Sequence, residues 1–355
     1  MTRLLVTLAF PPHVGGMQRH LYQWVSRARA EYLVAAPSWP GAAAWDAQQP
    51  FPIYRWSGGP GGWPGWRRVR QTAGALRALQ WARARGPLEM LELGQVLPFG
   101  LVALWAQARW GIPYRVWAFG DDVLKPARRP VVRALTRMIL TRASRVYAIS
   151  HYTGELLRTR FRVSAQVVHP RPAAHFRPGD ARAARARLGL PQDALILLTV
   201  ARLEPRKGVD RVLRVLPALV RRFPHLLYAV VGEGSARARW QALAHRLGVA
   251  HRVLWAGQVD DATLVSWYRA ADLFVLIPTP GPGEVEGFGL VYVEAAACGL
   301  PSVAGDNGGV REAVLHGKTG WLVPPDDPEQ LEAALTLLLG DDALRGRLRR
   351  WMLGH

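Results

Sequence analysis

The chain has 355 residues, half of them hydrophobic, and its 46 Lys and Arg against 26 Asp and Glu give a formal charge of +20. This length exceeds one ordinary hydrophobic core, so two domains are expected. No uncharged apolar stretch is long enough to span a bilayer, and the opening MTRLLVTLAFPP suits a buried strand better than a signal peptide. The single cysteine, Cys298, excludes an internal disulfide and fits a reducing compartment.

The positive charge is concentrated in the first half. Residues 1–177 contain 25 Lys and Arg against 7 Asp and Glu, a net charge of +18, together with ten of the fifteen tryptophans. Arginine with tryptophan is typical of a surface that meets anionic lipid headgroups, and nucleic acid is the competing partner for such charge. An arginine-rich proteome explains the same composition equally well.

The first half alternates strands with helices. A strand over residues 4–9 leads into a loop with the adjacent Gly15 and Gly16 and then a helix over 17–29. Adjacent glycines let the backbone approach a phosphate or sugar closely, although a structural turn is the more frequent explanation. Further strands are expected at 32–36, 88–93, 114–118 and 145–149, with helices at 67–85, 98–110 and 131–142. This order predicts a parallel sheet.

The basic helix predicted at 67–85 is amphipathic and follows a glycine- and proline-rich loop. Trp66, Val69, Ala73 and Leu76 share one face, while arginines lie towards the others. Such a helix suits a membrane interface, and an ordinary packed surface helix is an equally good interpretation.

The second half repeats the alternation after a proline- and arginine-rich linker at 168–180. Strands are expected at 195–200, 226–231, 253–257 and 273–277, with a helix at 261–270. Ligands of open parallel sheets lie beyond the carboxyl ends of the strands. Several candidate ligand-binding residues follow strand ends here, namely Arg202, Lys207, Gly232, Gly234 and Glu286. The predicted fold is therefore α/β with two doubly wound halves.

The run EGFGL, from Glu286 to Leu290, reads as a glycine turn that feeds a helix, and a helix N-terminus attracts anions. Glu286 and Glu294 bracket this position, and a carboxylate accepts hydrogen bonds from paired sugar hydroxyls. An anion and a polyol held side by side indicate a sugar nucleotide. Glu294 lies among Val293, Ala295 and Ala296, so its burial calls for a ligand or a protein partner.

Taken together, the motifs ARLEPRKG, VVGEG, AADLFV, EGFGLVYVE and GLPSVAGDNGGVREAV resemble the retaining family 4 glycosyltransferases. The resemblance spans nearly the whole chain and is closest in the second half. FPPHVGGMQRHLYQWV and LPFGLVALWAQARWGIPYRVWAFGDDV look most like the phosphatidylinositol mannosyltransferase branch. The family resemblance implies the GT-B architecture, in which two Rossmann-like domains face each other. Here the acceptor domain would be 1–172 and the donor domain 173–355.

The resemblance also implies roles for individual residues. Arg202 and Lys207 would neutralise the donor diphosphate, Glu286 would hold hydroxyls of the transferred sugar, and Glu294 would hold the ribose. The remaining donor-binding positions implied are Gly15 and Gly16, which would close over the phosphates, and Gly232, Gly234, Gly287, Phe288, Gly289 and Leu290.

One departure from the family concerns the reaction centre. Phe119 stands where the mannosyltransferase-like members carry a histidine before Gly120, and its role would pass to Asp121 or Asp122. In the front-face mechanism attributed to the family, the departing phosphate takes the acceptor proton, so no separate base is required.

The sequence therefore predicts a metal-independent retaining transferase that uses a UDP- or GDP-sugar and a lipid-linked or saccharide acceptor. It is expected to be cytoplasmic and peripheral at the inner face of the cell membrane, bound to its anionic surface, and not to bind nucleic acid. A nucleotide-sugar epimerase of the same fold and a basic nucleic-acid-binding protein are the alternatives.

Overall fold

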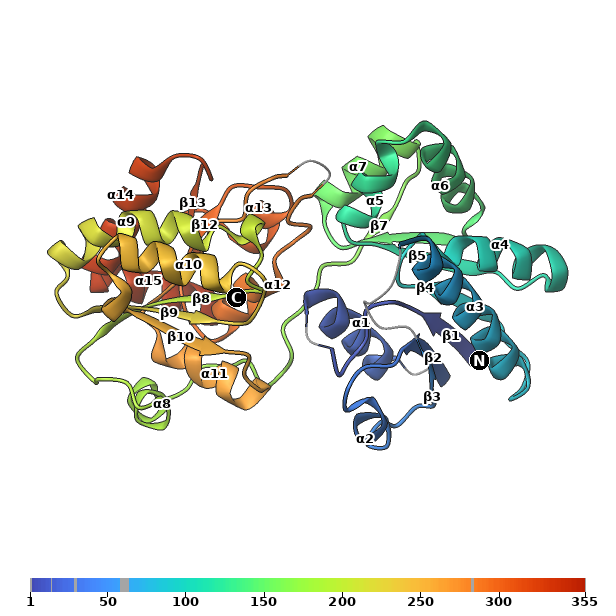
Figure 1. Cartoon of the computed structure of the whole chain (residues 1–355), viewed down its shortest axis with the longest axis horizontal. Coiled ribbons are helices and arrows are strands. Elements are labelled where there is room, and N and C mark those ends of the chain that lie inside the picture. The colour runs from blue at the N-terminus through green and yellow to red at the C-terminus, as the bar shows by residue number, and fades with distance from the viewer. Residues whose placement is uncertain (1, 14, 29–30, 58–63, 282–283, 355) are drawn as a thin grey trace. The chain divides into compact units, whose positions relative to one another are not determined.

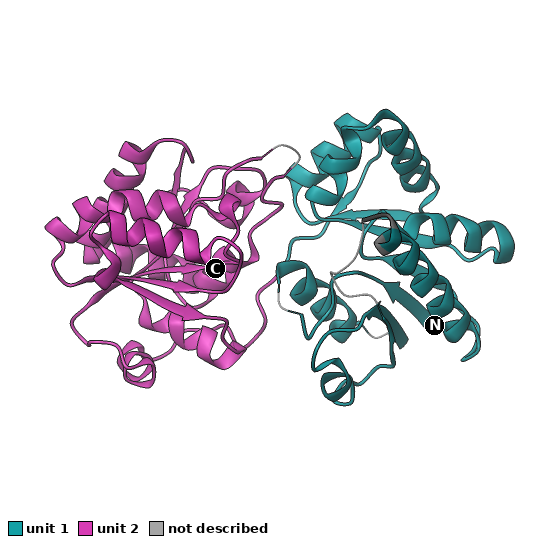
Figure 2. Ribbon diagram, viewed as in Figure 1, with its two compact units in different colours: residues 1–170 teal, residues 171–355 magenta. Residues whose placement is uncertain are grey.

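The computed structural model describes every residue except 1, 14, 29–30, 58–63, 282–283 and 355. The chain forms two compact units, residues 1–170 and 171–355 (Figure 2). The predicted domain boundary lies two residues later, between 172 and 173. Residues 168–180 contain no helix or strand, because prolines at 170, 172 and 178 interrupt backbone hydrogen bonding.

Unit 1 is built on a seven-stranded sheet whose pairs are all parallel, in the order β3-β2-β1-β4-β5-β6-β7. The strands are β1 (Thr2–Val6), β2 (Glu31–Pro37), β3 (Ile53–Trp56), β4 (Met90–Leu93), β5 (Tyr114–Ala118), β6 (Arg145–Ala148) and β7 (Gln166–Val167). Consecutive residues of β1, from Leu4 to Val6, are all buried, as expected of a parallel strand covered on both faces.

The helices of unit 1 cover both faces of this sheet (Figure 1). They are α1 (Gly16–Arg27), α2 (Ala42–Asp46), α3 (Pro64–Arg83), α4 (Phe99–Trp110), α5 (Asp121–Ala127), α6 (Pro130–Arg142) and α7 (His151–Phe161). One core joins the buried sides of α3, α4 and α6 to Leu4 and Val6 of β1. The basic helix expected at 67–85 is α3. It packs on the core through Ala75, Ala78, Leu79 and Ala82, whereas Trp66 and Val69 of the predicted apolar face are exposed.

A carboxylate lies at the centre of the opposite face of the sheet. Glu92 of β4 is fully buried and accepts hydrogen bonds from Trp24 Nε1 on α1 (2.9 Å) and from the Tyr32 hydroxyl on β2 (2.8 Å). Arg115 and Arg3 lie 3.6 and 3.9 Å from the same carboxylate. Burial and the charge of Glu92 raise the pKa of Tyr32 well above its usual value, so its hydroxyl stays a donor. These contacts attach α1 to four strands, β1, β2, β4 and β5.

Unit 2 has the same plan with six parallel strands in the order β10-β9-β8-β11-β12-β13. The strands are β8 (Leu195–Val200), β9 (Leu226–Val231), β10 (Val253–Gly257), β11 (Leu273–Leu276), β12 (Ser302–Gly305) and β13 (Gly320–Val323). In both units the strand order reverses beside the first strand, which is where open sheets bind ligands. The prediction of two doubly wound halves is confirmed.

The helices of unit 2 are α8 (Ala181–Leu188), α9 (Val209–Arg222), α10 (Arg237–Arg246), α11 (Asp261–Ala270), α12 (Leu290–Ala297), α13 (Val310–Ala313), α14 (Pro328–Gly340) and α15 (Asp342–Gly354), with 3-10 turns η1 (Pro205–Lys207) and η2 (Ala250–Arg252). Figure 1 shows α9 and α10 on one side of the sheet and α8 and α11 on the other. The apolar side of α9 supplies much of the core, including Val212, Leu216 and Leu219.

Glu92→Ala should destabilise unit 1 by about 3–5 kcal/mol, because it leaves two buried donors and two cations without their shared acceptor. Glu89→Ala, three residues away and exposed, is the matched control and should change the free energy of unfolding by less than about 0.5 kcal/mol. Urea denaturation and hydrogen exchange of β4 amides measure both. Equal stability of the two variants would contradict the role assigned to Glu92.

Candidate functional site

Three loops meet at the carboxyl edge of the unit 2 sheet because glycines allow close backbone contact. At Gly232, after β9, φ is 131° and a Cβ would lie 1.9 Å from the Ala201 carbonyl oxygen. At Gly208, after η1, φ is 69° and a Cβ would lie 1.9 Å from the Ile277 carbonyl oxygen. Side chains are excluded at both positions. The loops after β8, β9 and β11 are thereby held against one another.

Backbone hydrogen bonds fix the same loops. Leu203 N donates to the Glu233 carbonyl (2.8 Å), and Thr279 N donates to the Arg206 carbonyl (2.8 Å). Gly234 also packs on the backbone of Leu203, where a Cβ would lie 2.5 Å from the carbonyl oxygen. Gly232 and Gly234 are therefore required for loop packing, and their contact with a donor remains a prediction.

A cluster of five charged side chains lies where these loops meet. Lys207 Nζ donates to Glu286 Oε2 at 2.6 Å, and Arg206 Nη1 lies 3.7 Å from the same oxygen. Arg206 Nε is 3.4 Å from Glu204, which is also 3.1 Å from Arg202 Nη1. Three cations therefore share two carboxylates and leave a net charge of +1.

The cluster grades from buried to exposed. The side chains of Lys207, Glu286 and Arg206 are 12–16% exposed, whereas that of Arg202 is 53% exposed. Burial acts to raise the pKa of Glu286, but Lys207, Arg206 and Arg202 together lower the pKa below its usual value. Glu286 is therefore ionised at neutral pH. A buried carboxylate beside partly exposed cations can accept hydroxyl hydrogen bonds while an anion binds next to it.

The helix that follows Glu286 begins as the sequence predicts. Gly289 precedes α12 with a left-handed φ of 89°, Leu290 is its first residue, and Phe288 and Leu290 are buried. Gly309 N donates to the Glu286 carbonyl (2.9 Å), which fixes the backbone before the turn at Gly287. This segment is one continuous feature with the charged cluster.

Glu294 lies on α12 and is 1% exposed. The Tyr268 hydroxyl of α11 donates to its Oε2 at 3.0 Å. The sequence requires a ligand or a protein partner at this position, and the structure supplies Tyr268. Its contact with a ribose stays a prediction.

Unit 1 places its candidates at the carboxyl edge of its own sheet. Gly15 is the N-cap of α1, and Gly16 is its first residue. Asp121 and Asp122 begin α5, a helix that the sequence analysis does not predict, after β5 and Phe119. Asp122 Oδ1 accepts from Phe119 N (2.8 Å), whereas its Oδ2 is buried and has no hydrogen-bond partner among the residues that the structure describes. Burial raises the pKa of Asp122 to about 7.

Sequence reasoning misses two members of the charged cluster, Arg206 and Glu204. Both lie inside the ARLEPRKG motif, but their position after a strand does not reveal which side chains turn towards Glu286. It also misses Tyr268 beside Glu294, because this contact joins different helices. The motif run Glu204-Pro-Arg-Lys207 is the signal that could have identified the first two.

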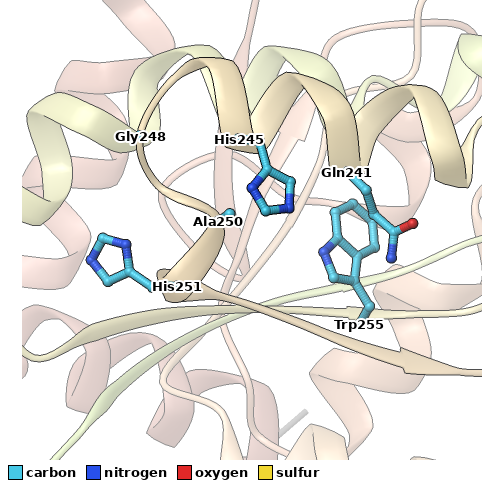
Figure 3. Close-up of a pocket in the computed structure, with 6 residues that line it drawn as sticks. All are labelled: Gln241, His245, Gly248, Ala250, His251 and Trp255. Atoms are coloured by element: carbon cyan, nitrogen blue, oxygen red, sulfur yellow. The ribbon is translucent and has the colours of Figure 1, made fainter.

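A shallow hollow of about 720 Å³ lies elsewhere in unit 2, between α10 and the edge strand β10. It is lined by Gln241, His245, Gly248, Ala250, His251 and Trp255 (Figure 3). None of these residues belongs to the charged cluster. The candidate site is therefore the charged cluster with its converging loops, and not this hollow.

The profile of the family described as "Glycosyl transferases group 1" matches residues 180–351. A curated GDP-mannose-dependent alpha-(1-6)-phosphatidylinositol monomannoside mannosyltransferase of Mycolicibacterium smegmatis is 35% identical over 372 aligned residues, which cover 99% of this chain and 94% of that protein. D-inositol 3-phosphate glycosyltransferase 2 of Catenulispora acidiphila is 38% identical over 68% of this chain and 60% of that protein.

A sucrose-phosphate synthase structure from Thermosynechococcus elongatus matches the fold with a TM-score of 0.83, at 22% identity, over 100% of this chain and 94% of that one. At this identity the likeness shows the fold alone. The GT-B fold that the sequence predicts is thereby confirmed.

Asp122→Asn should make unit 1 relatively more stable as the pH rises. The pKa of Asp122 is raised from 3.8 to about 7 in the folded chain, so the folded chain favours the protonated carboxyl. The contribution of this group to stability is complete below pH 3.8 and is lost as the pH rises towards 7. Asparagine keeps the acceptor for Phe119 N and does not ionise. Between pH 5 and 8 the free energy of unfolding of the variant should gain about 2 kcal/mol relative to the parent. A difference independent of pH would contradict this.

Proposed function

We propose that this chain, which belongs to the group 1 glycosyltransferases, transfers mannose from GDP-mannose to an inositol-containing glycolipid with retention at the anomeric carbon. The observation that carries the proposal is the ion pair between Lys207 and Glu286, with Arg202 and Arg206 beside it. This cluster combines cations that would bind a diphosphate with a carboxylate that would accept hydrogen bonds from sugar hydroxyls. The mannosyltransferase relative, aligned along 99% of this chain, supports the choice of sugar and nucleotide.

The family assignment from the motifs is confirmed, and the chain is a glycosyltransferase. The alternatives, an epimerase or a nucleic-acid-binding protein, are not supported. The inositol 3-phosphate glycosyltransferase relative makes a soluble inositol phosphate the second candidate acceptor.

The donor would bind across the charged cluster of unit 2. Arg202 and Lys207 would contact the diphosphate, and Glu286 would accept hydrogen bonds from the sugar hydroxyls. Charge-assisted contacts of this kind are worth about 1.5–3 kcal/mol each. Glu294, held by Tyr268, would accept from the ribose, and the backbone from Gly287 to Leu290 would border the phosphate.

The reaction would break the bond between the anomeric carbon and the phosphate oxygen and form the bond to the acceptor oxygen on the same face. The acceptor proton would pass to the departing phosphate oxygen. The cations of the cluster would stabilise the leaving charge, which is the work that a divalent metal does elsewhere. In unit 1, Gly15 and Gly16 would contact the phosphates, and Asp121 and Asp122 would lie near the acceptor.

We assign the membrane-facing surface to three helices of unit 1, α3, α4 and α6. They contain nine arginines and no acidic residue. Large apolar side chains are exposed on them, including Trp66 (72%), Trp105 (45%) and Val131 (81%). None of the described helices combines the length and apolarity needed to cross a bilayer. Peripheral binding to the anionic inner face of the cell membrane fits these features.

Lys207→Met and Glu286→Gln should each lower kcat/KM by ~100-fold or more, because each removes a charge-assisted contact and the main counter-charge of its partner. The assay supplies radiolabelled GDP-mannose with phosphatidylinositol monomannoside, and inositol 3-phosphate in parallel. Lys318→Met and Glu329→Gln, which change exposed residues of unit 2, are the controls and should retain activity. Parent-like turnover by either site variant would rule out the proposed donor site.

Replacing Arg133, Arg137 and Arg142 of α6 by Gln should weaken binding to phosphatidylserine-containing vesicles about 100-fold, since each arginine near an anionic surface contributes ~1 kcal/mol. Sedimentation at rising salt measures the effect, and the parent should dissociate as salt increases. The control replaces three exposed arginines of unit 2, Arg182, Arg187 and Arg246. Equal loss in both triple variants would place the membrane contact elsewhere.

A further inference from the structure

Arg206 lies between the two carboxylates of the charged cluster. Its Nε is 3.4 Å from Glu204, its Nη1 is 3.7 Å from Glu286, and its side chain is 16% exposed. Thr279, in the loop after β11, donates to its carbonyl from both N (2.8 Å) and Oγ1 (3.4 Å). Arg206 is therefore fixed through its backbone and both ends of its guanidinium.

Glu286 shares its main partner with the proposed donor. Lys207 Nζ contacts one carboxylate oxygen, Oε2, and that ammonium is also the group proposed to bind the diphosphate. As the ammonium turns towards a more highly charged anion, its hold on Glu286 weakens. The carboxylate would then be buried with a weakened counter-ion, which favours protonation.

Arg206 is placed to prevent this. Its contact with Glu286 does not depend on Lys207, and Glu204 holds the guanidinium from the other side. A planar guanidinium presents its donors in a rigid fork, so Arg206 contacts both carboxylates from one position. Among the described residues, the other charged or titratable groups that act on Glu286 are Arg202, on the same loop, and Tyr292 of α12.

We infer that Arg206 is the positioning residue that keeps Glu286 ionised and directed at the sugar hydroxyls while Lys207 engages the donor diphosphate. This inference rests on the proposed function and extends it to Arg206, a residue to which the family resemblance assigns no role. Glu204 acts on the same geometry from the opposite side, because it holds both Arg206 and the exposed Arg202.

The test compares Arg206→Met and Arg206→Lys with the parent in GDP and GDP-mannose calorimetry across pH, without acceptor. The affinity for GDP-mannose relative to GDP reports the sugar contacts. The affinity ratio should fall at low pH, when Glu286 becomes protonated. In Arg206→Met this fall should occur at a pH roughly one unit higher, because a cation near Glu286 has been removed. Arg206→Lys keeps the positive charge, so its pH dependence should return most of the way to that of the parent. Affinity for GDP itself should stay within about threefold, while Lys207→Met should lose ~10-fold or more.

Arg246→Met, which removes an exposed cation from the last turn of α10, is the matched control and should leave the pH dependence unchanged. An unmoved pH dependence in Arg206→Met would overturn the inference. So would a loss of GDP affinity as large as that of Lys207→Met, which would make Arg206 a phosphate ligand instead. Absence of mannosyl transfer by the parent contradicts the proposed function, whereas the calorimetry still decides the role of Arg206.

Discussion

The ion pair between Lys207 and Glu286 is the interaction on which the candidate site depends. It joins the loop after β8 to the loop after β11, and Arg206 and Glu204 extend it towards the exposed Arg202. Because the pair is mostly shielded from solvent, each charge needs an opposite charge close by, and Arg206 supplies a second one for Glu286. A donor that replaces one partner by a diphosphate and the other by hydroxyls would keep both satisfied.

The two units manage buried charge in different ways. In unit 1, Glu92 is enclosed by an indole, a phenol and two guanidinium groups, and it anchors α1 to the sheet. In unit 2, the charges lie at the edge of the sheet and are only partly covered, so a ligand can reach them. The first arrangement encloses its carboxylate completely, whereas in the second the Arg202 side chain is 53% exposed. This difference is why we assign ligand chemistry to the second.

Much of the fold followed from sequence patterns. Unbroken apolar runs such as 195–200 and 226–231 identified buried parallel strands, and the residues after them identified the loops of the site. The short helix α5 was missed, because Asp121 and Asp122 read equally well as a loop. The strand expected at 4–9 ends at Val6, because beyond it Leu8 N donates to Gln95 Oε1 and Ala9 N to Thr7 Oγ1 instead of to a neighbouring strand. The contact of Tyr268 with Glu294 was missed because the two residues lie on different helices. Arg206 and Glu204 were missed because residue spacing does not determine where their side chains point.

The sequence by itself determined the family, the two α/β halves and the identities of Arg202, Lys207, Glu286 and Glu294 as candidates, since motif order and strand ends are local properties. Only the tertiary structure decided how these residues are partnered. Ion pairing and burial depend on which loops approach one another, and here that depends on glycines such as Gly208 and Gly232 that let backbones touch. The structure therefore revealed that Glu286 is held by two cations and Glu294 by Tyr268. The approach of distant loops, rather than the order of residues, determines these contacts.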